Sequence, residues 1–270
     1  FQAQSIRRQD VHFIHVAQKH AKCAKRGSHI QFILTISIMF HVFTLLIKEE
    51  ICMRRKVMVL SMGQSPENCE TNDIYATLSK TCNVKLRGIL DDITEKELNL
   101  LAPAQGERFI VTALRDGREI RVAERIAMHK VNDCLIEAEQ NGASAAMILC
   151  TGHFEIPPLQ MLVFTPERIL LSLLRSMGVR KLGAIVPKVE QIKATEEYYK
   201  EFSPCIRAAS PYGAKETIAE IAKEFRDSDI DLLMSDCMGF TKELGELIQH
   251  VAGKNVLVPR VVLPALMEAV

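Results

Sequence analysis

The sequence predicts an α/β protein built from parallel sheets and divided into two pseudosymmetric, Rossmann-like lobes. Short apolar runs alternate with amphipathic helical segments from Val57 to the end of the chain, as in parallel α/β domains. Two of these runs end in a cysteine followed by a glycine-containing turn, at Cys150 and at Cys237. Because ligands bind at the carboxyl ends of parallel strands, we expect both thiols to face one cleft between the lobes.

The composition is that of an ordinary globular protein. Of 270 residues, 48% are hydrophobic and 25% are charged, and the formal net charge is +1. With no Lys/Arg stripe and no Trp, a nucleic-acid partner is not expected. None of the eight cysteines falls in a CxxC or Cys/His spacing, which predicts no metal site and free thiols in a reducing cytoplasm. The glycine motifs of dinucleotide sites and P-loops are also absent, and no cofactor is expected.

Residues 1–52 do not share the pattern of the rest of the chain. They include a basic, His-rich stretch and an apolar run at 30–47 that just reaches the length of a membrane span. Polar residues interrupt this run, and Lys/Arg residues flank both of its sides. Since Met53 is followed at once by a basic cluster and the first apolar strand, we interpret 1–52 as an extension from a misassigned start. An N-terminal membrane anchor is the alternative, although we expect no membrane association.

The first half of the pattern alternates strands with helices and includes one hairpin. An apolar strand at 56–61 enters the turn from Gly63 to Pro66. Asp116-Gly117 between two β-rich runs signals a hairpin, which we place at the edge of the first lobe. Gly142 ends a long amphipathic helix in the manner of a C-terminal cap. The expected strands are 56–61, 84–90, 107–114, 119–122 and 145–149, and the expected helices are 68–80, 93–101 and 123–141.

The second half repeats this scheme, which indicates an internal duplication. The strand before Cys150-Thr-Gly corresponds to the strand before Asp236-Cys-Met-Gly, and the turn at Gly63 corresponds to the strand end at Pro187. We expect the first lobe to comprise 53–163 and 255–270, and the second to comprise 164–254. The expected strands are 181–186, 205–209, 230–234 and 256–258, and the expected helices are 166–177, 190–202, 214–225, 242–251 and 261–270.

Cys150 and Cys237 are the predicted catalytic residues. A thiolate is a competent base, and two thiols on opposite faces of a substrate carbon can remove a proton from one side and return it to the other. Such chemistry needs no cofactor. The alternative is that each cysteine is a small core residue at a buried strand end.

The turns around these strand ends supply the predicted substrate-binding residues. N–H groups and the hydroxyl of Gly63, Gln64 and Ser65 can hold a carboxylate or phosphate, or can simply form a tight strand–helix turn. Asp236 can hold Cys237, bind an ammonium group or cap the next helix. The other expected members are Thr151, Gly152, Pro187 and Gly239. Three weaker candidates are His153 as an acid or base, the pair Asp91-Asp92, and Arg115 as a carboxylate ligand; each also fits a surface loop or turn.

Taken together, these residues resemble the AroM family over 53–270. The resemblance rests on the segment from Val57 to Pro66, the hairpin from Thr112 to Gly117, and the two cysteine turns at 149–152 and 236–240. It carries over no established activity. The family name reflects a gene neighbourhood with shikimate-pathway genes in some bacteria.

More distantly, the chain is similar to the aspartate/glutamate racemase superfamily, which implies two pseudosymmetric lobes with a cysteine at a strand end in each. The usual Cys-Asn-Thr and Gly-Cys-Thr-His patterns are replaced here by Cys150-Thr-Gly and Asp236-Cys-Met-Gly. Both thiols are kept, while the residues that surround the amino-acid substrate in those enzymes have changed.

Two functions remain open from the sequence. The first is a cofactor-independent isomerase, racemase or lyase that acts on a small carboxylate through the two cleft cysteines. The second is a non-catalytic binding or regulatory protein linked to aromatic (shikimate) metabolism. We expect a small carboxylate ligand, a cytoplasmic location and possible homodimerisation in either case.

Overall fold

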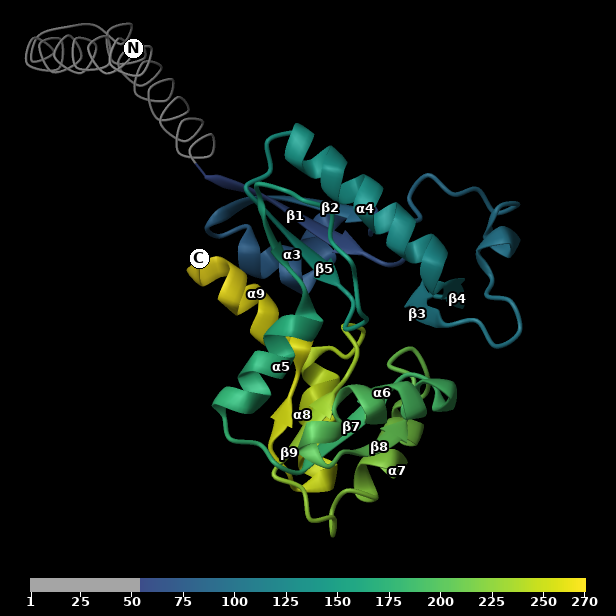
Figure 1. Ribbon diagram of the computed structural model, residues 1–270, viewed down its shortest axis with the longest axis vertical. Helices are drawn as coiled ribbons and strands as arrows, with labels where there is room; N and C mark the ends of the chain where they lie inside the picture. Colours follow the sequence, from purple (N-terminus) through teal and green to yellow (C-terminus); the bar gives the residue numbers. More distant parts are fainter. Residues whose placement is uncertain (1–53) are drawn as a thin grey trace, which may run out of the picture. The chain divides into compact units, whose positions relative to one another are not determined.

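The computed structural model describes residues 54–270, of which 55–270 form one unit (Figure 1). The predicted extension at 1–52 and its apolar run at 30–47 lie outside the described residues. Within the described part, two four-stranded parallel sheets are flanked by helices, which confirms the predicted α/β class with two lobes.

The first sheet has the strand order β2-β1-β5-β6, with every pair parallel. Residues 57–60 of β1 and 145–148 of β5 are buried on both faces, as expected of strands in a covered parallel sheet. The bounds of the strands are β1 Arg55–Ser61, β2 Cys82–Gly88, β5 Ala145–Leu149 and β6 Leu162–Phe164. The helices of this half are α3 Asp73–Leu78 and α4 Glu124–Gln140.

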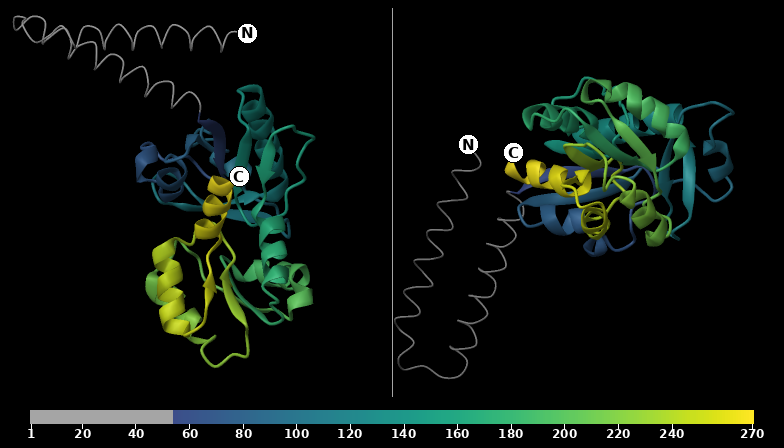
Figure 2. Two further views of the ribbon diagram at one scale, coloured as in Figure 1. Left: turned by 90° about the vertical axis from the view of Figure 1, so that its left-hand side faces the viewer. Right: turned by 90° about the horizontal axis from the view of Figure 1, so that it is seen from below.

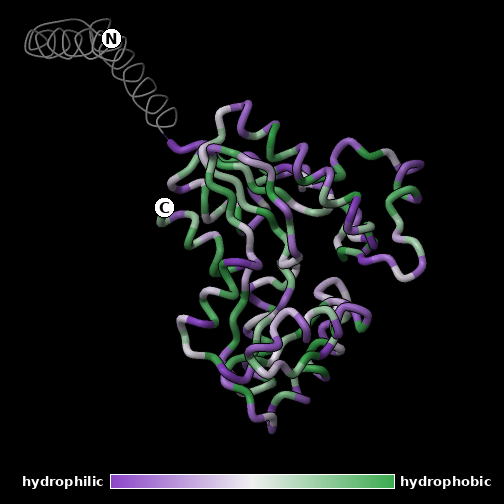
Figure 3. The backbone as a smooth tube through the Cα atoms, viewed as in Figure 1, coloured by the Kyte–Doolittle hydropathy of each residue, from purple (hydrophilic) through white to green (hydrophobic). Residues whose placement is uncertain are grey.

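The second sheet has the order β10-β9-β7-β8 and is again entirely parallel. Its strands are β7 Leu182–Val186, β8 Cys205–Ala208, β9 Leu232–Ser235 and β10 Val256–Leu257. The helices of this half are α6 Ile192–Tyr198, α7 Lys215–Lys223 and α8 Lys242–Ala252. Apolar segments follow the strands of both sheets in Figure 3, where the buried clusters lie.

The two sheets have the same topology. Read in the reverse direction, the second order is β8-β7-β9-β10, so β1, β2, β5 and β6 correspond to β7, β8, β9 and β10. The cysteine turns therefore follow equivalent strands, β5 and β9. This agreement confirms the internal duplication expected from the sequence.

The two helices that follow the edge strands cross between the lobes. Helix α5 (Pro166–Ser176) leaves β6 of the first sheet and buries Leu170 and Leu174 among the residues of the second sheet. Helix α9 (Pro259–Ala269) leaves β10 of the second sheet and buries Leu263 and Met267 in the first. Figures 1 and 2 show α9, in yellow, alongside α3. Each of these helices thus packs into the core of one lobe while following an edge strand of the other.

A two-stranded antiparallel hairpin interrupts the first lobe. Strands β3 (Phe109–Ala113) and β4 (Glu119–Ala123) pair with each other and with neither large sheet. The hairpin also reaches the second lobe, because Glu119 pairs with Lys188 and Arg121 pairs with Glu190. The predicted hairpin is confirmed, but it bridges the two lobes, whereas the sequence analysis placed it at the edge of one.

Several element predictions are corrected by the structure. The expected helix 68–80 is split into a 3₁₀ turn and α3, because the side chains of Asn68 and Asn72 each cap a separate start. The expected helix 93–101 forms only a 3₁₀ turn at Leu98–Leu101. Strand β6 was not predicted. Strand β10 pairs with β9, so residues 256–257 belong to the second sheet and not to the first lobe.

The turn at 63–66 does bind a carboxylate, but one that belongs to the chain itself. Asp91 accepts hydrogen bonds from the Ser65 N–H (2.7 Å), the Ser65 hydroxyl (2.8 Å) and the Gly88 N–H (2.8 Å). Arg115 of the hairpin loop completes this set at 2.9 Å. The side chain of Asp91 is only 11% exposed, and it occupies these donors. Asp91 therefore joins β1, β2 and the hairpin.

We expect Asp91→Ala to destabilise the protein by about 3 kcal/mol, because buried donors and the Arg115 guanidinium lose their partner. The neighbouring Asp92→Ala is the matched control. Asp92 is 79% exposed and, among residues 54–270, pairs only with Arg87, so its loss should cost less than about 1 kcal/mol. Urea unfolding of both variants checks this, and equal losses would contradict the role assigned to Asp91.

Candidate functional site

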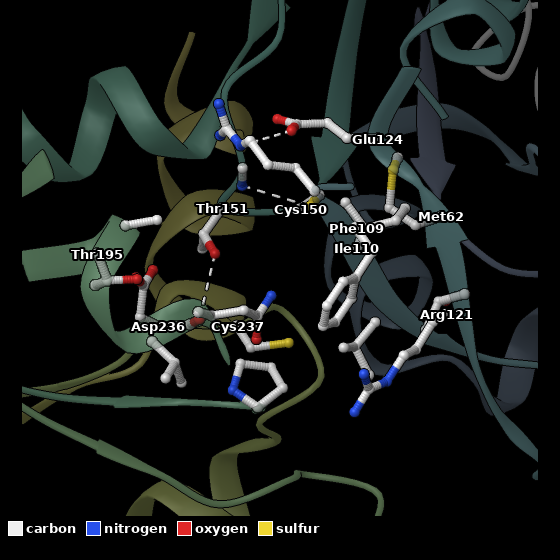
Figure 4. A pocket seen from close by; sticks show the side chains of 18 of the residues that line it. Met62, Phe109, Ile110, Arg121, Glu124, Cys150, Thr151, Thr195, Asp236 and Cys237 are labelled. Atoms are coloured by element: carbon white, nitrogen blue, oxygen red, sulfur yellow. Dashed lines mark hydrogen bonds and ion pairs between the residues drawn. The ribbon is translucent and has the colours of Figure 1, made fainter. Parts of the chain in front are cut away.

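A cavity of about 1110 Å³ lies where the carboxyl ends of the two sheets meet (Figure 4). Its walls come from the cysteine turns of both lobes, from the hairpin with the segment that precedes it, and from helix α6. Residues that the sequence analysis singled out and that line this cavity are Cys150, Thr151, Gly152, His153, Pro187, Asp236, Cys237 and Gly239. The two cysteine turns, which lie 87 residues apart, are thus brought to one space.

The two thiols have matching surroundings. Cys150 directly follows β5 and accepts a hydrogen bond from the Gly152 N–H at 3.4 Å. Cys237 follows β9 and accepts one from the Gly239 N–H at 3.3 Å. Both side chains are half-buried free thiols. Each turn therefore presents its sulfur in the same way, as the duplication predicts.

Burial raises the pKa of both thiols to about 12. The glycine N–H groups act in the opposite direction, while the nearby Asp236 carboxylate raises both pKa values further. Arg260 opposes this rise at Cys237. In the free protein at neutral pH, both thiols are consequently protonated.

Asp236 is a buried acid on the cavity wall. Its residue is 8% exposed, and its Oδ1 has no hydrogen-bond partner in the described part of the chain. Burial raises the pKa of Asp236 to about 7, and the Thr151 hydroxyl opposes the rise. That hydroxyl also donates to the Asp236 carbonyl at 3.3 Å, which links the two cysteine turns directly (Figure 4).

A histidine and a second buried acid also line the cavity. Nδ1 of His153 lies 2.9 Å from Oε1 of Glu167, whose side chain is 6% exposed. Burial and the nearby Glu167 carboxylate raise the pKa of Tyr198. His153 was a candidate from the sequence, but Glu167 and Tyr198 were not. Their signal was weak, because an acid just after Pro166 fits the first turn of any helix.

Arg260 brings a guanidinium group to the cavity wall beside the second cysteine turn. It binds the carboxylate of Asp73 through Nε at 2.8 Å and donates from Nη1 to the Met238 carbonyl at 2.9 Å. Met238 lies within the second cysteine turn. Close by, a Cβ on Gly239 would lie 2.8 Å from the Tyr212 hydroxyl, so this turn requires glycine to accommodate the tyrosine. The sequence analysis identified neither Arg260 nor Tyr212.

Three predicted substrate-binding residues do not line the cavity: Gly63, Gln64 and Ser65. Ser65 is bound to Asp91, and the side-chain Oε1 of Gln64 accepts a hydrogen bond from the backbone N–H of Arg115 at 3.1 Å. A Cβ on Gly63 would lie 2.1 Å from the Ala113 carbonyl, so the glycine allows the hairpin to pack closely. Asp91 and Arg115 are used in the same contacts and do not line the cavity either.

The family model described as AroM protein matches residues 57–270. The chain belongs to the AroM family. Comparison with the sequences of curated proteins finds no match. Among residues 54–270 of this AroM chain, no helix is long and apolar enough to cross a membrane, and no group of three or more His, Cys, Asp or Glu residues is placed to hold a metal ion.

Solved structures similar to this AroM chain share its two-lobed fold. A liganded double mutant of arylmalonate decarboxylase is 13% identical, with a TM-score of 0.52, and the match covers 80% of this chain and 91% of that one. The maleate isomerase Iso from Pseudomonas putida S16 is 13% identical, with a TM-score of 0.51 and coverage of 80% and 92%. The aspartate racemase of Picrophilus torridus is 10% identical, with a TM-score of 0.51 and coverage of 79% and 92%.

The raised thiol pKa values predict slow alkylation at neutral pH. With iodoacetamide, the rates at Cys150 and Cys237 should rise in proportion to hydroxide between about pH 7 and pH 10, without a plateau. A short cysteine peptide, which levels off above a pKa of about 8.5, is the control. Peptide mass spectrometry resolves the two sites. A plateau near pH 8 at either thiol would contradict the assignment.

Asp236 should make stability depend on pH. Its pKa is about 7 in the folded protein and about 3.9 in an unfolded chain, so the unfolded state loses this proton first as the pH rises. The stabilisation is complete below about pH 4 and is lost as the pH rises through about 7. We therefore compare the free energy of unfolding of Asp236→Asn with that of the native protein at each pH. From pH 4 to pH 8, this difference should shift in favour of the variant by up to about 4 kcal/mol. Thermal unfolding at both pH values checks this; an unchanged difference would refute it.

Proposed function

We propose that this protein catalyses cofactor-independent proton transfer at the carbon next to a carboxylate of a small substrate, as an isomerase, racemase or related lyase. One observation carries this proposal: two equivalent thiols, one from each lobe, line the same cavity with the same backbone donor geometry. A pair of acid–base groups delivered from two sides is the arrangement that two-sided proton transfer at carbon requires.

The proposed step uses only the two thiols. One thiolate takes the proton from the substrate carbon, which forms an S–H bond and leaves the electron pair on carbon, delocalised into the carboxylate. The opposite S–H then gives its proton to the other face of the carbon and becomes the thiolate. Either of Cys150 and Cys237 can begin the cycle, so both must be present for exchange in both directions.

The raised thiol pKa values affect this step in two ways. A thiolate whose conjugate acid has a pKa of about 12 is a stronger base than an ordinary thiolate, which suits a weakly acidic C–H bond. The thiolate form is also scarce at neutral pH. The rate of proton transfer should therefore increase with pH between about pH 7 and pH 10, as the rate of alkylation does.

The cysteine turns provide groups to orient the substrate. Thr151, Gly152 and Gly239 lie beside the sulfurs on the cavity wall, and Pro187 follows the central strand β7 of the second sheet. Backbone N–H groups of such turns bind anionic oxygens. We assign carboxylate orientation to these turns and to Arg260, replacing the predicted segment 63–65.

A non-catalytic binding or regulatory role is the second candidate. The feature in its favour is that burial raises the pKa of both thiols to about 12, which disfavours the thiolate at neutral pH. Such a protein would bind a carboxylate in this cavity without exchanging its protons.

Solvent exchange separates the two candidates. The protein is incubated in D₂O with a panel of small carboxylates, and deuterium at the carbon next to the carboxylate is followed by NMR. We expect incorporation with the native protein, and a loss of about 100-fold or more with Cys150→Ala and with Cys237→Ala. Cys69→Ala, a half-buried cysteine outside the cavity, is the control and should exchange normally.

Folding of each variant is verified by its thermal unfolding curve. If either cavity variant exchanges as fast as the native protein, the two-thiol mechanism is wrong. If a carboxylate raises the Tm of the native protein and no exchange occurs at any pH, the binding role replaces the catalytic one.

A further inference from the structure

We propose that the hairpin β3–β4 is an ionic latch between the two lobes, and that the lobes part at this latch when a molecule enters or leaves the cavity. The latch comprises Glu119 and Arg121 of the hairpin with Lys188, Glu190 and Ser210 of the second lobe. This inference goes beyond the proposed function, because it concerns access to the cavity and not the chemistry of the thiols.

The hairpin is firmly attached to the first lobe. Ile110, Leu114 and Val122 are at most 6% exposed, and they belong to the core cluster that also holds residues of β1, α4 and β5. At the hairpin loop, Arg115 binds the carboxylate of Asp91 at 2.9 Å. The hairpin therefore moves with the first lobe as one body.

The contacts of the hairpin with the second lobe are polar and charged. The Glu119 carboxylate pairs with Nζ of Lys188 and accepts a hydrogen bond from the Ser210 hydroxyl. Two residues further along β4, which is the same face of a strand, Arg121 donates from Nη1 to Oε1 of Glu190 at 2.9 Å. Lys188 and Glu190 follow β7 and Ser210 follows β8, so one strand of the hairpin holds two loops of the second lobe.

The latch lies at the wall of the cavity. Arg121 and Glu190 line the cavity themselves, as do Pro187 beside the latch and Tyr212. The backbone N–H of Tyr212 donates to the Ser210 hydroxyl oxygen at 3.2 Å, which connects this part of the wall to the latch. Separation at the latch would thus move two loops of the wall away from the hairpin.

The other large connection between the lobes is apolar. Helices α5 and α9 bury Leu170 and Leu174 in one lobe and Leu263 and Met267 in the other, all at 0% exposure. Separating the lobes there would expose these side chains to water, whereas separating the latch exposes charged groups that water solvates well. Figures 1 and 2 show α5 and α9 on one side of the unit and the hairpin on the other. The lobes therefore open first at the latch, with α5 and α9 as the hinge.

Solvent exposure makes the latch reversible. Arg121 and Glu190 are exposed, and Glu119 and Lys188 are half-buried. The Arg121 guanidinium also lies 4.5 Å from the centre of the Phe109 ring, which holds it in place on the hairpin. Because salt screens ion pairs that solvent reaches, high ionic strength should favour the open arrangement.

Thiol reagents of two sizes test the latch without requiring turnover. Rates at Cys150 and Cys237 are measured at one pH with iodoacetamide and with a bulky, uncharged biotin-linked maleimide, with peptide mass spectrometry as the readout. Each rate is divided by that of a short cysteine peptide. We expect Arg121→Glu and Glu119→Ala to raise the bulky-to-small ratio at both thiols by about fivefold or more, because the open arrangement is populated more often. About 1 M sodium chloride should raise the ratio in the native protein as well.

Two further variants serve as controls. Arg118 lies on the same hairpin but pairs with Glu95 and Asp116 of its own lobe, so Arg118→Gln should leave the ratio unchanged. Combining Arg121→Glu with Glu190→Arg rebuilds the ion pair with its charges exchanged. This double variant should return the ratio to within about twofold of the native value. Thermal unfolding curves verify that each variant is folded.

A native ratio in both Arg121→Glu and Glu119→Ala would overturn the latch. So would a double variant that stays as reactive toward the bulky reagent as Arg121→Glu alone, because the effect would then not depend on the ion pair. Should a variant fail to fold, the native protein decides: a ratio that does not change with salt contradicts the inference.

The two proposals fail separately, since thiol access is measured without a substrate. Opened variants together with no deuterium exchange for any carboxylate leave the latch and remove the two-thiol chemistry. Deuterium exchange in the native protein together with an unchanged bulky-to-small ratio leaves the proposed function and removes the latch.

Discussion

The parallel pairing of the central strands determines where both thiols lie. In the first sheet Ser61 is paired with Leu149, and in the second Ile185 is paired with Ser235, so the two cysteine turns start from strand ends of the same kind. A residue directly after such a strand lies at the carboxyl end of the sheet, which in this protein faces the other lobe. Burial at that edge raises the pKa of both thiols and of Asp236, so the position and the acid–base properties of the site have one cause.

Close packing of the two lobes turns separate strand ends into one cavity. The Thr151 hydroxyl joins the two cysteine turns, Arg260 joins α3 to the second of them, and the hairpin β3–β4 pairs with Lys188 and Glu190 across the opening. These contacts are polar and lie on the rim or wall of the cavity. They join the two lobes around the cavity that both cysteines line.

Much of the fold was predictable because its signals are local. An apolar run followed by Cys-Thr-Gly or Asp-Cys-Met-Gly identifies a strand and the turn after it, and the hairpin is marked by Asp116-Gly117. The partner of the turn at Ser65 was not predictable, since Asp91 comes from 26 residues later and reaches the turn only once β1 and β2 pair. Glu167 and Arg260 were missed for a similar reason. Their place on the cavity wall depends on the crossing of α5 and α9, which leaves no pattern in the sequence around them.

The exchange of α5 and α9 has a consequence for how the chain acquires its structure. The sheet of the first lobe is complete once residue 164 has been made, yet one of its faces is covered by Leu263 and Met267, about a hundred residues further on. During synthesis that face remains exposed to water until the last helix emerges from the ribosome. The two lobes therefore depend on each other for their cores, and Arg260 in the first turn of α9 belongs to the cavity wall that both lobes form.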